Sequence, residues 1–295
     1  MKTIAIVIFL FFNLYFCSAQ ESPFPVKKHF VHDAISREYL LYMPHQLVDN
    51  APLIVILHGY SSSAEKIMSY SGMNQLAEDF GFALVYPQGT FDADSNRFWN
   101  VGYSFHQEIK VNDVDFLAML VDSLQREYSL SNENSFITGM SNGGEMCYLM
   151  ACKYPELFKA FAPVAGMMMD HFFDCCNSTV PVSLFAIFGT NDRVTNFNGD
   201  ALNKDGWGAY KSIPFAIDFW KERLRDPVCK TKILENKNQN DGSYIVIEDC
   251  MDTISQKEIL FYKVENGDHD WPGAWGNMDI DASLDILNFF QSKIE

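Results

Sequence analysis

The chain has 295 residues, of which 48% are hydrophobic and 20% are charged, a composition that allows a large buried core and excludes a disordered or fibrous protein. Its formal net charge of −16 repels polyanions. We therefore expect neither a nucleic-acid partner nor binding to an acidic membrane, and a neutral substrate suits this charge better than an acidic polysaccharide.

The first residues are typical of a secretory signal peptide. One early lysine precedes an apolar run at residues 4–16, and small residues follow up to Ala19. We expect cleavage near Ala19, so that residues 1–19 are a leader and residues 20–295 are exported to the extracellular or periplasmic space, free of the membrane. An uncleaved membrane anchor is the alternative, but the apolar run is short for a span.

Short apolar segments recur along the mature chain and predict strands. In chain order, these segments are 37–44, 52–59, 82–89, 134–139, 160–166, 181–189, 243–250 and 258–267. The five from 52–59 to 181–189 are rich in branched or aromatic residues and end at a glycine, a pattern typical of strands buried on both faces of a parallel sheet. The first segment is expected to be an outer strand.

Segments with apolar residues at helical spacing lie between and after these strands, at 112–128, 143–155 and 281–294. Alternation of strands and helices implies right-handed crossovers and an open α/β fold, in which a doubly wound, mostly parallel sheet carries helices on both faces. Neither a repeat nor a linker rich in Pro, Gly or Ser interrupts the chain. Residues 20–295 are therefore predicted to form a single domain.

Ser141 lies between two glycines at the end of a predicted strand, in the stretch Gly-Met-Ser-Asn-Gly at 139–143. A strand followed at once by Gly-x-Ser-x-Gly and a helix is the pattern of a nucleophile elbow, in which the glycines make room for a sharp turn. The turn would hold the serine hydroxyl at the helix N-terminus, which favours developing negative charge. The alternative is an ordinary helix start capped by serine.

A nucleophilic serine needs a base, and the base needs a carboxylate that orients it. On such a sheet the chain order is Ser, then Asp or Glu, then His. Asp192 follows the glycine that ends its strand and is our candidate acid, whereas Asp200 and Asp205 lie deeper in a polar loop. Of the seven histidines, only His269 follows both Ser141 and Asp192, which makes it the candidate base. A surface-loop histidine is the alternative.

The loop after segment 52–59 is predicted to complete an oxyanion hole. His58 and the glycine after it form a pair that commonly shapes the loop donating one of the two amides. We assign the hole to the backbone N–H groups of Tyr60 and Asn142. Removing one donor of this kind costs about 3–4 kcal/mol of transition-state stabilisation.

Trp99 and Trp271 are predicted to form walls of a substrate pocket beside the serine, and Trp207 and Trp275 could extend them. Packing in the core is the alternative for each indole.

Several segments together resemble the secreted polyhydroxybutyrate depolymerase and feruloyl esterase group of the α/β-hydrolases, which includes acetyl xylan esterases. These segments are 57–60, 86–89, 97–102, 112–120, 137–166, 188–192 and 267–273. They follow the family's order over most of the mature chain, and the family's nucleophile, acid and base fall on Ser141, Asp192 and His269. The chain departs from the family pattern in the extra-looking stretch 201–212 and in the residues just before His269.

The resemblance implies the α/β-hydrolase fold and a secreted serine esterase that needs no cofactor. The implied substrates are hydroxycinnamoyl or acetyl esters on a neutral plant cell-wall polysaccharide such as xylan. A hydroxyalkanoate polyester or its oligomers are the alternative substrate. The alternative outside enzymes is a secreted carbohydrate-binding module that lost its chemistry.

Six cysteines follow the predicted leader, an even number that suggests disulfides in an exported chain. We expect a bridge between Cys229 and Cys250, which would brace the loop carrying His269, and a bridge from Cys152 to one of the two cysteines at 175–176. Because neither a Cys-x-x-Cys pair nor a Cys/His cluster with ligand spacing occurs, we expect no metal.

Overall fold

The computed structural model describes residues 24–176 and 179–294. The predicted leader and its cleavage site at Ala19 lie outside the described residues. Within the described residues, no helix is both long enough and apolar enough to cross a membrane.

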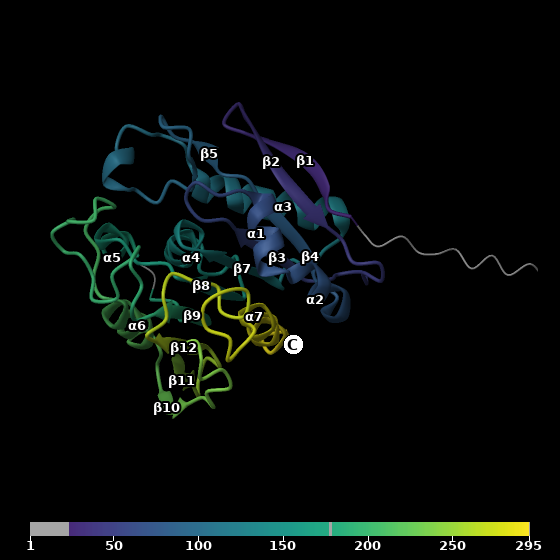
Figure 1. Cartoon of the computed structure of the whole chain (residues 1–295). Coiled ribbons are helices and arrows are strands. Elements are labelled where there is room, and N and C mark those ends of the chain that lie inside the picture. Colours follow the sequence, from purple (N-terminus) through teal and green to yellow (C-terminus); the bar gives the residue numbers. More distant parts are fainter. Residues whose placement is uncertain (1–23, 177–178, 295) are drawn as a thin grey trace, which may run out of the picture.

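A ten-stranded sheet forms the centre of the molecule, with β1 and β10 at its opposite edges (Figure 1). Across the sheet, the strands are β1 (Val26–His32), β2 (Ile35–Tyr42), β4 (Ala83–Pro87), β3 (Leu53–Leu57), β7 (Ser135–Met140), β8 (Ala160–Val164), β9 (Leu184–Gly189), β12 (Glu258–Glu265), β11 (Tyr244–Asp252) and β10 (Pro227–Ile233). Strands β4 to β12 in this order pair in parallel, whereas the pairs at both edges are antiparallel. A separate hairpin joins β5 (Thr90–Phe91) to β6 (Arg97–Phe98).

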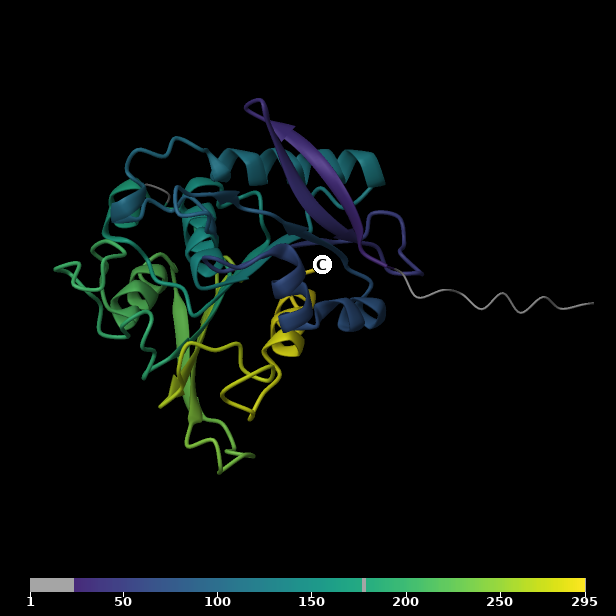
Figure 2. The same ribbon diagram turned by 45° about the horizontal axis from the view of Figure 1, so that its top comes forward.

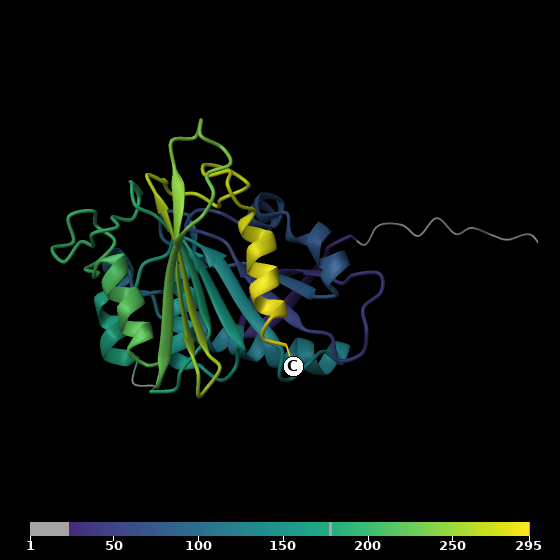
Figure 3. The same cartoon turned by 90° about the horizontal axis from the view of Figure 1, so that it is seen from below.

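Helices cover both faces of the sheet, and α7 lies on the face opposite α6 (Figure 3). One buried cluster contains side chains from α1 (Ala64–Ser71), α2 (Met73–Phe80) and α7 (Ala282–Gln291). The other contains side chains from α3 (Asp113–Tyr128), α4 (Asn142–Lys153), α5 (Asp170–Cys175) and α6 (Ile213–Lys221). Alternate residues of β3 enter the two clusters, as the side-chain alternation of a strand requires. The predicted doubly wound, mostly parallel sheet is confirmed.

The outer elements are the ones that sequence reasoning missed. The β1–β2 hairpin lies against α3 (Figure 2), where the rings of Phe30 and Phe116 are 6.2 Å apart. Every residue of β10 is exposed, so this edge strand has no apolar alternation from which to recognise it. The short helices α1, α2 and α5 and the 3₁₀ turn Ser104–His106 were not predicted either.

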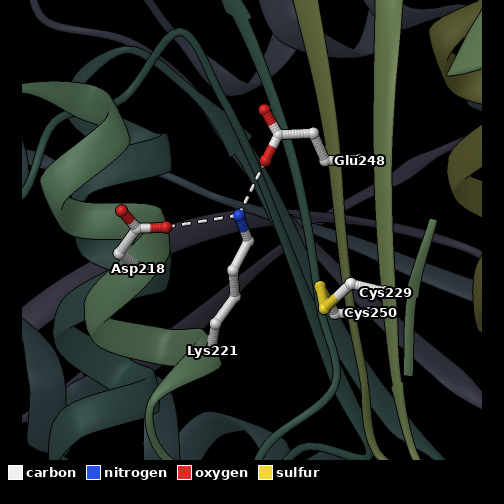
Figure 4. The surroundings of a disulfide bond; sticks show 5 residues. All are labelled: Asp218, Lys221, Cys229, Glu248 and Cys250. Carbon is white, nitrogen blue, oxygen red and sulfur yellow. Dashed lines mark hydrogen bonds and ion pairs between the residues drawn. A yellow bond between two sulfur atoms is a disulfide. The ribbon is translucent and has the colours of Figure 1, made fainter. Parts of the chain in front are cut away.

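Two disulfides confirm the predicted pairings. Cys152 is bonded to Cys176, and Cys229 is bonded to Cys250. The second bridge joins β10 to β11 beside α6, on which Lys221 pairs with Glu248 of β11 at 2.6 Å (Figure 4).

The predicted role of the second bridge is wrong. Cys250 pairs with Ile259 near the start of β12, whereas the chain leaves the other end of β12 at Glu265 toward His269. The bridge therefore fastens the edge hairpin and does not brace the base loop.

Candidate active site

Ser141 occupies a strained turn between β7 and α4. Its φ of 55° and ψ of −122° lie in a region that L-residues rarely adopt. The turn depends on its glycines: a Cβ at Gly139 would lie 2.7 Å from the carbonyl carbon of Gly143, and a Cβ at Gly143 would lie 2.5 Å from the carbonyl oxygen of Leu57. The Ser141 side chain makes no capping hydrogen bond to α4, so the helix-cap alternative does not explain this serine.

Asp192 and His269 follow β9 and β12, which are neighbouring parallel strands. The imidazole Nδ1–H donates to Asp192 Oδ2 at 2.7 Å. The other carboxylate oxygen accepts from the backbone N–H groups of Val194 and Thr195, both at 2.8 Å. Because a carboxylate only accepts, the proton resides on Nδ1, and Nε2 is left free to accept a proton. The Asp192 side chain is fully buried, which keeps water from the carboxylate.

Ser141 and His269 line the same cleft, which has a volume of about 420 Å³. Among the described residues, no hydrogen bond joins the serine hydroxyl to the imidazole. Part of the wall comes from α1, which contributes Lys66, Ile67 and Tyr70, and these lining residues were missed by the sequence analysis. The available signals were the N-cap Ser63 and the terminating Gly72, which bracket this short helix.

The Gly59–Tyr60 loop lies beside the serine. A Cβ at Gly59 would be 3.9 Å from Ser141 Oγ. The Tyr60 amide has no hydrogen-bond partner among the residues that the structure describes. Asn142 is the first residue of α4, so its N–H has no acceptor within the helix. Both predicted oxyanion donors are thus near Ser141, and their role stays a prediction.

His58 is fully buried below this loop. Its Nδ1–H donates to the carbonyl of Gly59 at 2.7 Å, and its Nε2 accepts from the N–H of Gly89 at 2.9 Å. Burial lowers the pKa of His58 to about 4. The ring is therefore neutral near pH 7, and its two nitrogens connect the loop after β3 to the loop after β4.

The predicted walls from Trp99 and Trp271 are wrong, because both indoles are buried to at least 99%. The Trp99 N–H donates to the carbonyl of His58 at 2.9 Å, and the Trp271 N–H donates to Ser283 Oγ at 2.9 Å. These hydrogen bonds hold both rings inside the core. Trp207 is half-buried, and its ring lies 5.7 Å from the ring of Tyr60, which does line the cleft.

A buried carboxyl group lies behind the serine and was not anticipated. Glu145, in the first turn of α4, accepts from the Tyr103 hydroxyl at 2.6 Å and from Asn142 Nδ2 at 3.5 Å. Burial raises the pKa of Glu145 to about 7. The sequence signal was a single acidic residue in an otherwise mostly apolar helical segment, and the structure buries the first eleven residues of that helix.

Known esterases and depolymerases are similar in sequence to this chain. Residues 37–182 match the family model described as esterase PHB depolymerase. The bifunctional acetylxylan esterase/xylanase of Neocallimastix patriciarum is 28% identical over 161 residues, which are 55% of this chain and 22% of that protein. The poly(3-hydroxyalkanoate) depolymerase C of Paucimonas lemoignei is 30% identical over 229 residues, 77% of this chain and 53% of that protein. The chain thus spans less than two thirds of the length of both relatives.

Among solved structures, the acetyl xylan esterase from Aspergillus awamori has a TM-score of 0.60 at 15% identity, and the superposition covers 90% of this chain and 99% of that one. Together with the sheet order and the turn at Ser141, this likeness shows that the protein has the α/β-hydrolase fold. Residues 37–182, just under half of the chain, are similar to the esterase PHB depolymerase family.

Proposed function

We propose that this protein is a serine esterase that hydrolyses carboxylic esters through an acyl-enzyme. One observation carries the proposal: a serine held in a strained turn opens onto the same cleft as a histidine whose Nδ1 is paired with a buried carboxylate. This arrangement has the components that activate a hydroxyl, namely a nucleophile, a base and a group that orients the base.

In the proposed mechanism, Ser141 Oγ attacks the ester carbonyl carbon while Nε2 of His269 takes its proton. Asp192 holds the imidazole in the required tautomer and stabilises the imidazolium that forms. The Tyr60 and Asn142 N–H groups donate to the oxyanion. The imidazolium then protonates the leaving alcohol. A water molecule, deprotonated by the same imidazole, then attacks the acyl-enzyme. The acid is released as the imidazolium returns the proton to Ser141 Oγ.

We propose hydroxycinnamoyl or acetyl esters of xylan as substrates. The names of the relatives support this class, since one is an acetylxylan esterase/xylanase. A hydroxyalkanoate polyester is the second candidate, favoured by the similarity to a poly(3-hydroxyalkanoate) depolymerase. Secretion and the single-domain organisation of residues 20–295 are part of the same proposal.

Hydrolysis of p-nitrophenyl acetate by the wild-type protein and by Ser141→Ala tests the activity. Loss of the nucleophile is expected to lower kcat by about 10³-fold or more. Ser212→Ala is the matched control, because Ser212 also lies at a helix start but caps α6 by accepting from the N–H of Phe215. This control is expected to lose about 1 kcal/mol of stability and to keep its activity.

Turnover by wild-type protein that survives in Ser141→Ala contradicts the proposed nucleophile. A wild-type protein that is inert toward esters but binds xylan supports the carbohydrate-binding module. For the substrate, release of ferulate from methyl ferulate, of acetate from acetylated xylan and of hydroxybutyrate from its oligomers are compared by kcat/KM.

A further inference from the structure

Trp99 is bonded to both segments that carry the predicted oxyanion donors. Its indole N–H donates to the carbonyl of His58 at 2.9 Å. Its backbone N–H donates to Asn142 Oδ1 at 2.7 Å, and its carbonyl accepts from Asn142 Nδ2 at 3.1 Å. All three residues are fully buried, so water does not compete for these bonds. We call these three hydrogen bonds the Trp99 bridge.

The two donors belong to separate parts of the fold. Tyr60 follows β3 by way of His58 and Gly59, whereas Asn142 opens α4 after β7. The Trp99 bridge joins the carbonyl of His58, which lies just before the Gly59–Tyr60 loop, to the side chain of Asn142. A residue that makes no contact with the cleft thus connects the two halves of the predicted oxyanion hole.

The surroundings hold both ends of the Trp99 bridge in place. At one end, the His58 ring lies 5.0 Å from the Trp99 ring and is itself bonded to Gly59 and Gly89. At the other end, the Asn142 amide must present its oxygen to one backbone group of Trp99 and its nitrogen to the other. The amide therefore has a single orientation that satisfies the pair.

We propose that Trp99 is a positioning residue whose bridge sets the spacing of the Tyr60 and Asn142 N–H groups. The proposal rests on the proposed esterase function. An oxyanion donor is effective at about 2.7–3.1 Å from the developing charge, so a shift of either segment weakens transition-state stabilisation. Binding of the neutral ester depends less on these donors, and the effect should therefore fall on kcat.

Trp99→Phe tests the proposal because it keeps an aromatic ring in the core and removes the indole N–H. With p-nitrophenyl acetate, kcat is expected to fall about 10- to 100-fold, which is less than the loss for deleting a donor outright. The KM for the ester is expected to change little. An unchanged kcat overturns the proposal.

Trp220→Phe is the matched control. The Trp220 side chain is also buried, and its indole N–H donates to the sulfur of Met168 at 3.1 Å. Trp220 lies on α6 and belongs to the same buried cluster as Trp99. The control loses a buried indole hydrogen bond, and Trp220 has no bond to His58, Tyr60 or Asn142, so its kcat is expected to stay near the wild-type value. Equal losses of kcat in the two variants would mean that general loosening of the core is responsible, which overturns the proposal.

Asn142→Ala provides a second test should Trp99→Phe fold poorly. Alanine keeps the backbone N–H of residue 142 but removes both side-chain bonds to Trp99. Because the two changes break one bridge, the double variant Trp99→Phe/Asn142→Ala is expected to be little slower than the slower single variant. If the loss of kcat in the double variant equals the product of the two single losses, the two side chains act independently, and the proposal is overturned.

The failure of this proposal is distinct from the failure of the proposed function. Wild-type turnover that depends on Ser141, together with unimpaired Trp99→Phe, contradicts only the Trp99 bridge. A wild-type protein without esterase activity contradicts the proposed function and the bridge together.

Discussion

The two sides of the candidate active site depend on different physical constraints. On the side of the nucleophile, Gly139, Ser141 and Gly143 are neighbours in the chain, and a Cβ at either glycine would meet backbone atoms at 2.7 or 2.5 Å. On the side of the base, Asp192 and His269 come from loops after two different strands and meet through one hydrogen bond of 2.7 Å. The nucleophile side depends on close backbone packing, whereas the base side depends on charge and on the position of one proton.

Because of this difference, substitutions on the two sides should affect different properties, stability on one side and reaction rate on the other. A methyl group added on the nucleophile side changes the shape of the backbone packing, so it should affect stability first. An isosteric change on the base side leaves the shape intact and changes which atom carries a proton, so it should affect the reaction first. Four predictions test or sharpen this comparison.

The largest effect is expected for Asp192→Asn on the base side. The new amide oxygen can still accept from the Val194 and Thr195 N–H groups. The amide nitrogen, however, replaces the oxygen that accepts from His269 Nδ1, and it can only donate to that ring nitrogen. The imidazole is then favoured in the wrong tautomer, and kcat for p-nitrophenyl acetate is expected to fall about 10⁴-fold. The urea unfolding midpoint should stay close to that of the wild type.

Asp200→Asn is the control for that variant. Asp200 is also buried in a loop after β9, but its carboxylate accepts from the backbone N–H of Asp205 and not from the imidazole. Its kcat is expected to remain near the wild-type value. A similar loss in both variants would argue against Asp192 as the acid.

On the nucleophile side, Gly143→Ala is expected to act on stability. The added methyl group would lie 2.5 Å from the Leu57 carbonyl oxygen, a backbone atom that cannot rotate away. We expect a loss of about 4 kcal/mol or more in the free energy of unfolding, measured by urea denaturation.

The matched control for Gly143→Ala is Gly72→Ala. Gly72 has a φ of +63° but open space where its Cβ would be, so only the left-handed conformation opposes alanine there. That conformation costs about 1–2 kcal/mol. A smaller loss for Gly143→Ala than for Gly72→Ala would show that the turn can yield, contrary to the comparison above.

Glu145→Gln should change how stability depends on pH. Burial raises the pKa of Glu145 in the folded state from 4.5 to about 7, so the native state holds more protons than the unfolded state between these pH values. The stability of the wild type therefore falls as pH rises through this window, while Gln stays neutral. Relative to the variant, the wild type should lose up to about 3 kcal/mol in unfolding free energy between pH 4.5 and 7.5.

Urea denaturation of both proteins at several pH values measures this difference. A difference between variant and wild type that is independent of pH would show that the Glu145 carboxyl does not titrate in this window. The result also tests whether burial outweighs the hydrogen bonds that the Glu145 carboxyl accepts from Tyr103 and Asn142. On the base side, by contrast, N–H donors meet both carboxylate oxygens of Asp192.

The smallest effect on the reaction is expected from the edge of the sheet. Replacing both Cys229 and Cys250 by alanine opens the bridge between β10 and β11 and should cost about 3 kcal/mol of stability through the greater entropy of the unfolded chain. Because the bridge lies near the other end of β12 from His269, kcat is expected to be unchanged at temperatures where the variant is folded. A loss of kcat in the folded variant would indicate that the bridge does brace the loop carrying His269, contrary to the structure.

Much of the fold could be predicted because its central elements leave local signals. The strands β3, β4, β7, β8 and β9 are buried on all or nearly all of their length, and their sequences are correspondingly apolar throughout. The exposed edge strand β10 and the eight-residue helices α1 and α2 leave weaker signals, because short elements owe their structure to neighbours.

The site residues divide in the same way. The Ser141 turn is contained within a few consecutive residues, so the motif alone suggested it. Asp192 and His269 were predicted from chain order, and the hydrogen bond between them required the parallel pairing of β9 with β12. Trp99 and Trp271 were placed in the cleft because sequence position cannot distinguish an indole beside a cleft from one beneath it.

The sequence by itself determined the apolar strands, the glycines around Ser141 and the order of serine, acid and histidine, because each of these is a property of neighbouring residues or of chain order. Only the tertiary structure decided that Trp99 is bonded to His58 and Asn142, that Glu145 is buried with a raised pKa, and that the Cys229–Cys250 bridge lies away from the base. Burial and hydrogen bonding depend on which distant segments come together, and that information is spread over the whole chain.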